Sequence, residues 1–177
     1  MIGVLVSGEG TNLQSLIDAG LPIAAVASSR GDVGALARAD EAAIPNRVFA
    51  LDAYSDRAAR DRELADWLQL RGVDLVVLAG YMHLLTQVFL DRFRDRIVNV
   101  HPSLLPQFPG ARAIADALAA GVDTTGVTVH YVDEGLDTGA VIRQEPVAVE
   151  PRATLIERIH AVEHRILTEV VRELCAH

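Results

Sequence analysis

The sequence predicts an α/β protein whose sheet is Rossmann-like, open and mostly parallel, with helices on both faces. Strand-like and helix-like segments alternate along the chain, and several strands are apolar throughout, which is typical of strands covered on both sides. The last two strand-like segments are joined by a short loop, so we expect an antiparallel strand pair toward the C-terminal half. At 177 residues, without a repeat or a linker, the chain is expected to form a single domain, residues 1–177.

The expected strands are short apolar runs. The run at 2–7 leads directly into a glycine loop, and the run at 73–79 shows no regular polar alternation, so both are expected to be fully buried. The complete set of expected strands is 2–7, 23–27, 47–49, 73–79, 97–101, 125–131 and 140–147.

The expected helices follow from spacing and end signals. The first takes up helical spacing over 12–17, with Thr11 or Asn12 as its expected N-cap. In the amphipathic helix at 56–70, Trp67 shares one stripe with neighbouring leucines, which indicates a core residue rather than a ligand contact. The other expected helices are 34–43, a helix from about 86, one near 111–119, and 155–174.

Composition excludes several classes of protein. Half of the residues are hydrophobic and 23% are charged, so the chain can bury an ordinary core. A net charge of −8 argues against nucleic acid or an anionic membrane as a partner, because both require clustered basic residues. The absence of a long apolar stretch and of a secretory signal favours a cytoplasmic enzyme. Cys175 is the single cysteine, so no intrachain disulfide is expected.

A glycine loop, residues 7–12, follows the first strand and opens a helix. Glycine permits close backbone approach, and the helix start offers free N–H groups and a favourable dipole to an anion. Leu13 stands where the dinucleotide fingerprint requires a third glycine, so a mononucleotide-like phosphate is favoured over NAD. A tight strand-to-helix turn that simply needs glycine remains the alternative.

A second candidate site lies at the end of strand 97–101. Asn99 and His101 are two residues apart in a strand, so their side chains project to the same face, and Pro102 then restricts the backbone. The amide suits an oxygen that becomes negative, and the imidazole suits proton transfer, which together favour acyl transfer. Asp137, on a loop at 133–139, is the candidate carboxylate that orients the imidazole and favours its protonated form. His130 is interpreted as a strand position near this site.

Substrate attack is expected to be direct. No nucleophile elbow surrounds Ser103, so a covalent enzyme intermediate is disfavoured.

The loops at 8–12, 80–85 and 101–110 all follow strand C-termini, where open α/β sheets bind ligands. The 133–139 loop is expected to reach the same edge.

These motifs resemble those of the folate-dependent formyltransferases. The resemblance rests on Asn-x-His-Pro-Ser-Leu-Leu-Pro at 99–106 and Leu-Asp-x-Gly at 136–139. Gly-x-Gly-Thr-Asn-Leu-Gln at 8–14 and Leu-Ala-Gly-Tyr-Met at 78–82 narrow it to the branch that acts on glycinamide ribonucleotide. It implies the formyltransferase fold and transfer of formyl from 10-formyltetrahydrofolate, a co-substrate, to the glycinamide amine in purine synthesis. It also implies a monomer or homodimer that uses no metal.

The resemblance implies roles for individual residues. Catalysis is carried over to Asn99, His101 and Asp137. Ribonucleotide binding is carried over to Gly10, Thr11, Asn12, Pro102 and Glu163. Folate binding is carried over to Arg57, Met82, His83, Leu84, Leu85, Asn99, Asp133, Glu134, Gly135, Leu136 and Asp137. Residues 1–100 would form the nucleotide-phosphate-binding half and 101–177 the catalytic and folate-binding half. His83 departs from the family pattern, where arginine is usual at this position. The segment that would bind folate therefore carries one positive charge fewer than the resemblance implies.

Four other readings remain open. Formyltetrahydrofolate deformylase and methionyl-tRNA formyltransferase share the core motif, although an additional domain is usual in both. The His-x-x-Glu-His pattern at 160–164 matches a zinc-binding helix, but a catalytic zinc needs a third protein ligand. A non-catalytic nucleotide-binding module would explain the glycine loop, yet it gives no reason for Asn99, His101 and Asp137 to converge.

Overall fold

The computed structural model describes residues 1–176. Its strands are hydrogen-bonded in the order β3-β2-β1-β4-β5-β6-β7, and the predicted α/β class with a mostly parallel sheet is confirmed. The chain forms two compact units, Met1–Val98 and the chain from Asn99 onward, and their boundary falls within β5 (Ile97–His101).

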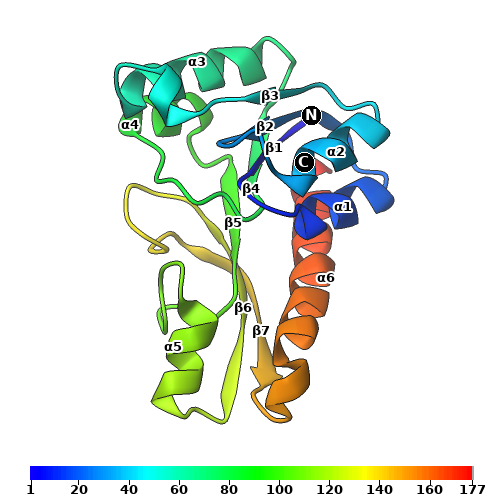
Figure 1. The fold of residues 1–177 in the computed structure, drawn as a ribbon, viewed down its shortest axis with the longest axis vertical. Coiled ribbons are helices and arrows are strands. Elements are labelled where there is room, and N and C mark those ends of the chain that lie inside the picture. The colour runs from blue at the N-terminus through cyan, green and yellow to red at the C-terminus, as the bar shows by residue number, and fades with distance from the viewer. Residues whose placement is uncertain (177) are drawn as a thin grey trace. The chain divides into compact units, whose positions relative to one another are not determined.

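The first unit is built on parallel strands that are buried on both faces. β1 (Ile2–Val6) pairs with β2 (Ile23–Ser28) and β4 (Leu75–Leu78), and β2 pairs with β3 (Asn46–Val48). Every residue of β1 and β4 is buried. Helices α1 and α2 pack against each other, as do α3 and α4, and the two pairs flank these strands (Figure 1). This double cover explains why the strands lack a polar face.

The helical segments of this unit are α1 (Thr11–Asp18), α2 (Gly34–Glu41), α3 (Arg57–Gln69), the single-turn α4 (Gln87–Leu90), and the 3₁₀ turns η1 (Leu51–Ala53) and η2 (Asp91–Phe93). The N-cap expected at Thr11 or Asn12 is wrong. Gly10 occupies that position with a φ of 77°, and no side chain caps α1. The strand-to-helix turn needs a left-handed residue there, which glycine supplies at no steric cost.

Trp67 is a core residue, as its helical stripe predicts. Its ring packs edge-on against Phe49, with centroids 5.5 Å apart. The guanidinium of Arg71 lies 4.1 Å from the Trp67 ring centroid and covers the indole. These contacts occupy the indole within the first unit and explain its burial without a ligand.

The second unit contains the expected antiparallel pair. β6 (Thr124–Tyr131) and β7 (Val141–Ala148) are antiparallel, and α6 (Leu155–Cys175) packs along both strands (Figure 1). α5 (Ala113–Ala120) follows β5, and the 3₁₀ turn η3 (Arg152–Thr154) precedes α6. α6 buries one apolar stripe, composed of Leu155, Ile159, Ile166, Leu167, Val170 and Val171.

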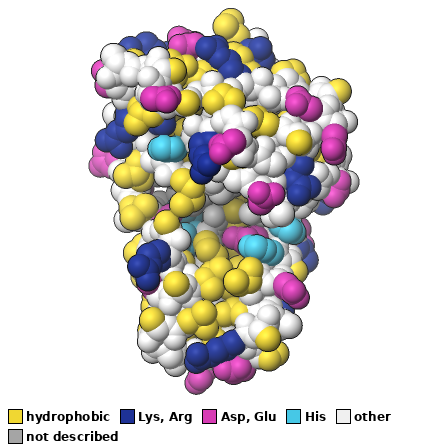
Figure 2. Space-filling view, in the orientation of Figure 1, with side chains coloured by type: hydrophobic (Ala, Val, Ile, Leu, Met, Phe, Trp, Pro, Cys, Tyr) yellow, Lys and Arg dark blue, Asp and Glu magenta, His cyan; other side chains and the backbone are white. Residues whose placement is uncertain are grey.

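The surface mixes both signs of charge. On the face drawn in Figure 2, basic side chains are scattered among acidic ones and do not gather into an extended patch. Within residues 1–176, none of the helices combines the length and the apolar character needed to cross a membrane.

Gly126 provides a test of the β6–β7 pairing. A Cβ at this position would lie 2.3 Å from the Glu145 carbonyl oxygen and 2.4 Å from Leu104 Cδ2. Because the oxygen belongs to the paired strand, the clash cannot be relieved without disturbing the ladder. We expect Gly126→Ala to lower the free energy of unfolding by about 2–3 kcal/mol, measured by urea denaturation. Gly31→Ala is the control, since its Cβ would meet only Val48 Cγ2 at 3.9 Å; equal losses in both variants would contradict the prediction.

Candidate active site

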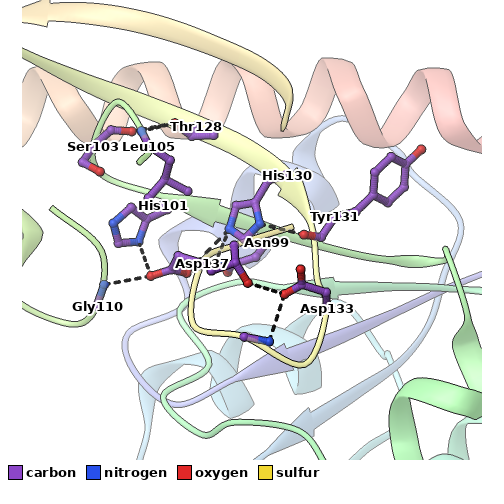
Figure 3. Close-up of polar contacts among 12 residues, drawn as sticks. Asn99, His101, Ser103, Leu105, Gly110, Thr128, His130, Tyr131, Asp133 and Asp137 are labelled. Carbon is purple, nitrogen blue, oxygen red and sulfur yellow. Dashed lines mark hydrogen bonds and ion pairs between the residues drawn. The ribbon is translucent and has the colours of Figure 1, made fainter. Parts of the chain in front are cut away.

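Asn99 and His101 lie on the same face of β5, as strand alternation predicts, and both point toward Asp137 (Figure 3). Val98 and Val100 point the other way into apolar surroundings. His101 is buried and Asn99 is half-buried. The strand therefore delivers an amide and an imidazole to one side while its other side belongs to the core.

The Asp137 carboxylate is surrounded by hydrogen-bond donors. Its Oδ2 accepts the Gly110 amide at 2.8 Å and lies 3.4 Å from His101 Nδ1. Its Oδ1 lies 3.4 Å from Asn99 Nδ2 and 3.6 Å from His130 Nε2. The predicted trio is thus brought together, with the side chain of Asp137 only 9% exposed.

The charge of Asp137 is held by these neighbours. Burial by itself raises the pKa of the carboxyl, but the His130 hydrogen bond, the Gly110 amide and the field of His101 together outweigh it and lower the pKa below 3.8. The carboxylate is therefore ionised at neutral pH. The backbone at Asp137 is left-handed, with a φ of 54°, a conformation that Asp and Asn tolerate better than most residues.

The tautomer of His101 follows from its contacts. Nε2 lies 2.8 Å from the Phe108 carbonyl oxygen, which can only accept, so Nε2 carries a proton. Nδ1 faces the Asp137 carboxylate, which stabilises the charge that the ring carries when a second proton binds there. Ser103 donates its hydroxyl to the carbonyls of Gln107 and Phe108. That hydroxyl therefore supports the loop.

His130 is a site residue whose contacts sequence reasoning missed. Its Nδ1 lies 2.7 Å from the Tyr131 carbonyl oxygen and must be protonated, which leaves Nε2 to face Asn99 Nδ2 at 3.2 Å and Asp137. Thr128 and His130 are buried polar residues that alternate with valines in β6. This alternation of polar and apolar residues was the available signal, because one face of a buried strand is seldom polar without a partner.

The loop before Asp137 is held by its own polar groups. Asp133 Oδ1 accepts the Gly135 amide at 3.0 Å and the Thr138 hydroxyl at 2.6 Å. Gly139 has no room for a side chain, since a Cβ would lie 1.8 Å from the Tyr131 carbonyl oxygen. Glu134 and Leu136 remain exposed on this loop. The sequence expectation that this loop reaches the strand end is confirmed within the second unit.

In the first unit, the glycine loop has both a structural and a binding rationale. Gly10 has a positive φ, and a Cβ would lie 2.6 Å from the Ala35 Cβ of α2, so the turn itself requires glycine. Thr11 begins α1, whose first N–H groups have no partner within the helix. Asn12 Oδ1 is buried and has no hydrogen-bond partner among the described residues. The free N–H groups at the start of α1 can therefore receive an anion, while the Asn12 oxygen, an acceptor, can bind a donor group.

The loop after β4 lies at the same edge as the glycine loop, as predicted. The Met82 amide donates to Ser7 Oγ at the end of β1, at 3.0 Å. Burial lowers the pKa of His83, and the positive charges of Arg60 and Arg57 lower it further. His83 is therefore neutral at pH 7. Arg57, in the first turn of α3, is exposed, and Leu85 is half-buried.

The remaining candidate positions lie in the second unit. Pro102 is half-buried directly after His101, and Glu163 is buried on α6. The rings of His160 and His164 stack with centroids 6.3 Å apart. Residues 1–176 contain no group of three or more His, Cys, Asp or Glu side chains placed to hold a metal ion.

Asp137→Asn tests whether the charge of Asp137 organises its neighbours. Asparagine keeps the shape and tolerates the left-handed backbone, so we expect a loss of about 1–3 kcal/mol at pH 7 through weakened hydrogen bonds. Because the folded pKa lies below 3.8, the stabilisation is fully present above about pH 4 and is lost as the pH falls further, through the folded pKa. Urea unfolding at several pH values measures this, and a difference between the proteins that does not shrink in acid would contradict it.

Comparison with known proteins places the chain in a family. A family model described as formyl transferase matches residues 1–171. Phosphoribosylglycinamide formyltransferase of Haemophilus influenzae is 42% identical over 180 residues, covering 97% of this chain and 85% of that protein. The trifunctional purine biosynthetic protein adenosine-3 of Drosophila pseudoobscura pseudoobscura is 44% identical over 174 residues, which is 92% of this chain but 13% of that protein. The crystal structure of glycinamide ribonucleotide transformylase 1 from Symbiobacterium toebii matches with a TM-score of 0.94 at 46% identity, over 97% of this chain and 85% of that chain. The chain belongs to the formyl transferase family.

Proposed function

We propose that this enzyme transfers the formyl group of 10-formyltetrahydrofolate to the amine of 5'-phosphoribosylglycinamide in de novo purine (IMP) biosynthesis. The observation that carries the proposal is the contact of the ionised Asp137 carboxylate with Asn99 and His101. An amide donor, a proton-carrying imidazole and a carboxylate are the groups that formyl transfer to an amine requires. The named activities of the related proteins supply the choice of acceptor.

The proposed chemistry proceeds by direct attack. The amine nitrogen forms a bond to the formyl carbon, and the carbonyl oxygen becomes negative. The positive charge of protonated His101 and a hydrogen bond from the Asn99 amide stabilise that oxygen. The amine proton passes by way of water and Asp137 to the folate nitrogen, and the bond between that nitrogen and the formyl carbon then breaks. The products are the N-formyl ribonucleotide and tetrahydrofolate, and no metal takes part.

The Asn99 amide nitrogen lies 3.2 Å from His130 Nε2 and 3.4 Å from Asp137 Oδ1. Both contacts are longer than a strong hydrogen bond, so turning one N–H toward a substrate oxygen exchanges a weak contact for a charged one. Long contacts of this kind are common in catalytic groups before substrate binds.

Substrate binding is proposed to follow the family positions. The ribonucleotide phosphate would bind at Gly10, Thr11 and Asn12 and the ribose at Glu163, with Pro102 shaping the channel. The folate would bind Arg57, Met82–Leu85 and Asp133–Asp137. The division of roles between 1–100 and 101–177, the cytoplasmic location and the monomeric or homodimeric state stay predictions.

The acceptor of the formyl group distinguishes this proposal from a deformylase. Purified protein is mixed with 10-formyltetrahydrofolate, and tetrahydrofolate formation is followed by absorbance with and without glycinamide ribonucleotide. We expect product only when the ribonucleotide is present, because its amine is the proposed acceptor of the formyl group. Equal release in its absence would assign water as the acceptor and reject the proposal.

His101→Ala is expected to lower kcat by at least about 100-fold while the KM for glycinamide ribonucleotide changes little, because the imidazole acts on charge that develops during transfer. Asp137→Asn should behave in the same way. Steady-state kinetics with each substrate varied measures both constants. His160→Ala, an exposed position on α6, is the control and should retain wild-type turnover. Near-normal kcat in His101→Ala would show that the assigned role is wrong.

A further inference from the structure

A buried ion pair in α3 has no role in the chemistry proposed above. Arg60 donates from Nε and Nη2 to Asp61 Oδ1, at 2.9 and 2.6 Å, and both side chains are 0% exposed. Other ion pairs of the same helix, such as Asp66 with Arg92, lie at the surface. Burying two charges is costly, so a pair that replaces apolar packing calls for a specific partner or purpose.

Asp61 binds the end of the loop that follows β4. Its second oxygen, Oδ2, accepts the backbone amide of Thr86 at 2.7 Å, directly before α4. The other end of this segment is held by the Met82 amide, which donates to Ser7 Oγ. Residues 82–85, here called the folate loop, are therefore held by the main-chain amide of Met82 at one end and by that of Thr86, which directly follows the loop, at the other.

Arg60 lies beside the aromatic residue at the start of this loop. Its guanidinium carbon is 6.0 Å from the Tyr81 ring centroid, and the Tyr81 ring packs on His83 at 5.6 Å. Arg60 Nη1 and Tyr81 Oη are both buried and lack hydrogen-bond partners within residues 1–176. Asp61 thus fixes the end of the loop, and Arg60 fills the space beside its start.

The folate loop presents apolar side chains outward while its backbone is held. Met82 is 63% exposed and Leu84 is 51% exposed, although both are large hydrophobic residues. The loop contains no Asp, Glu, Lys or Arg, and His83 is neutral at pH 7, so it has no charge of its own with which to attract a ligand. The contribution of this loop to recognition then rests on apolar contact and on main-chain groups, and both depend on where the backbone is placed.

We propose that Arg60 and Asp61 are positioning residues for folate, which hold the folate loop in its binding arrangement and thereby set the affinity for 10-formyltetrahydrofolate. The proposal rests on the proposed function, which assigns Met82–Leu85 to folate. It adds two residues of α3 that touch no substrate and act only through the backbone of the loop.

Thr86→Pro is the sharpest variant, because it removes the amide donor and leaves the buried charges in place. Thr86 has a φ of −80°, within the range of proline, and its carbonyl still accepts the amides of Phe89 and Leu90. We expect the KM for 10-formyltetrahydrofolate to rise about tenfold, since a hydrogen bond to a charged group is lost. The KM for glycinamide ribonucleotide should stay within about twofold.

Two controls separate positioning from general damage. Thr86→Ala keeps the amide and removes only a hydroxyl that has no partner in the described structure, so its folate KM should match the wild type. The double variant Arg60→Met with Asp61→Leu removes the pair without leaving a lone buried charge and should raise the folate KM as Thr86→Pro does. Adding Thr86→Pro to that double variant should then change the KM less than about twofold, because both act through one contact.

The outcomes distinguish this proposal from the proposed function. An unchanged folate KM in an active Thr86→Pro enzyme, or effects that simply multiply in the combined variant, would overturn the positioning role alone. A wild-type protein without turnover of 10-formyltetrahydrofolate would overturn the proposed function and the positioning role with it. Hydrogen exchange of the amides at 82–85 then still decides whether Asp61 anchors the loop, since protection should fall in Thr86→Pro and not in Thr86→Ala.

Discussion

The buried carboxylate of Asp137 accepts the Gly110 amide and faces two imidazoles and the amide of Asn99, and the geometry of the candidate active site depends on this set of contacts. The donors come from β5, β6 and the loop at Gly110, which are separate in the sequence. A charge with so little exposure is tolerated only when donors surround it, and these donors more than offset the effect of burial on its pKa. The carboxylate therefore brings β5, β6 and the Gly110 loop together at the site and also serves the proposed chemistry.

The two histidines beside Asp137 are oriented by the same kind of hydrogen bond. Each uses one ring nitrogen to donate to a main-chain carbonyl, that of Phe108 for His101 and that of Tyr131 for His130. Each then turns its other nitrogen toward the carboxylate. Main-chain carbonyls cannot donate, so the tautomers are decided by the backbone and not by the ligand. Both rings are thus held in a fixed orientation beside the carboxylate.

Carboxylates also hold the loops that are assigned to folate. Asp133 closes its own loop by accepting the Gly135 amide, and Asp61 holds the folate loop by accepting the Thr86 amide. In each case a carboxylate accepts a hydrogen bond from a main-chain N–H group. Such a bond is stronger to a charged oxygen than to a neutral one. Side chains exposed on these loops, Leu136 and Met82, are left free for contact with a ligand.

The sequence by itself determined the properties that depend on local periodicity. Apolar runs separated by helical stripes predicted the α/β class and the strands, and the two-residue spacing of Asn99 and His101 predicted their common face. The order of strand and loop also predicted that the loops after β1 and β4 share an edge, which the bond from Met82 to Ser7 confirms. Only the tertiary structure decided that Gly10 replaces a side-chain cap, that His130 contacts Asp137, and that Arg60 and Asp61 support a distant loop. These features arise from contacts between segments far apart in the chain. The spacing of residues within one segment does not determine such contacts.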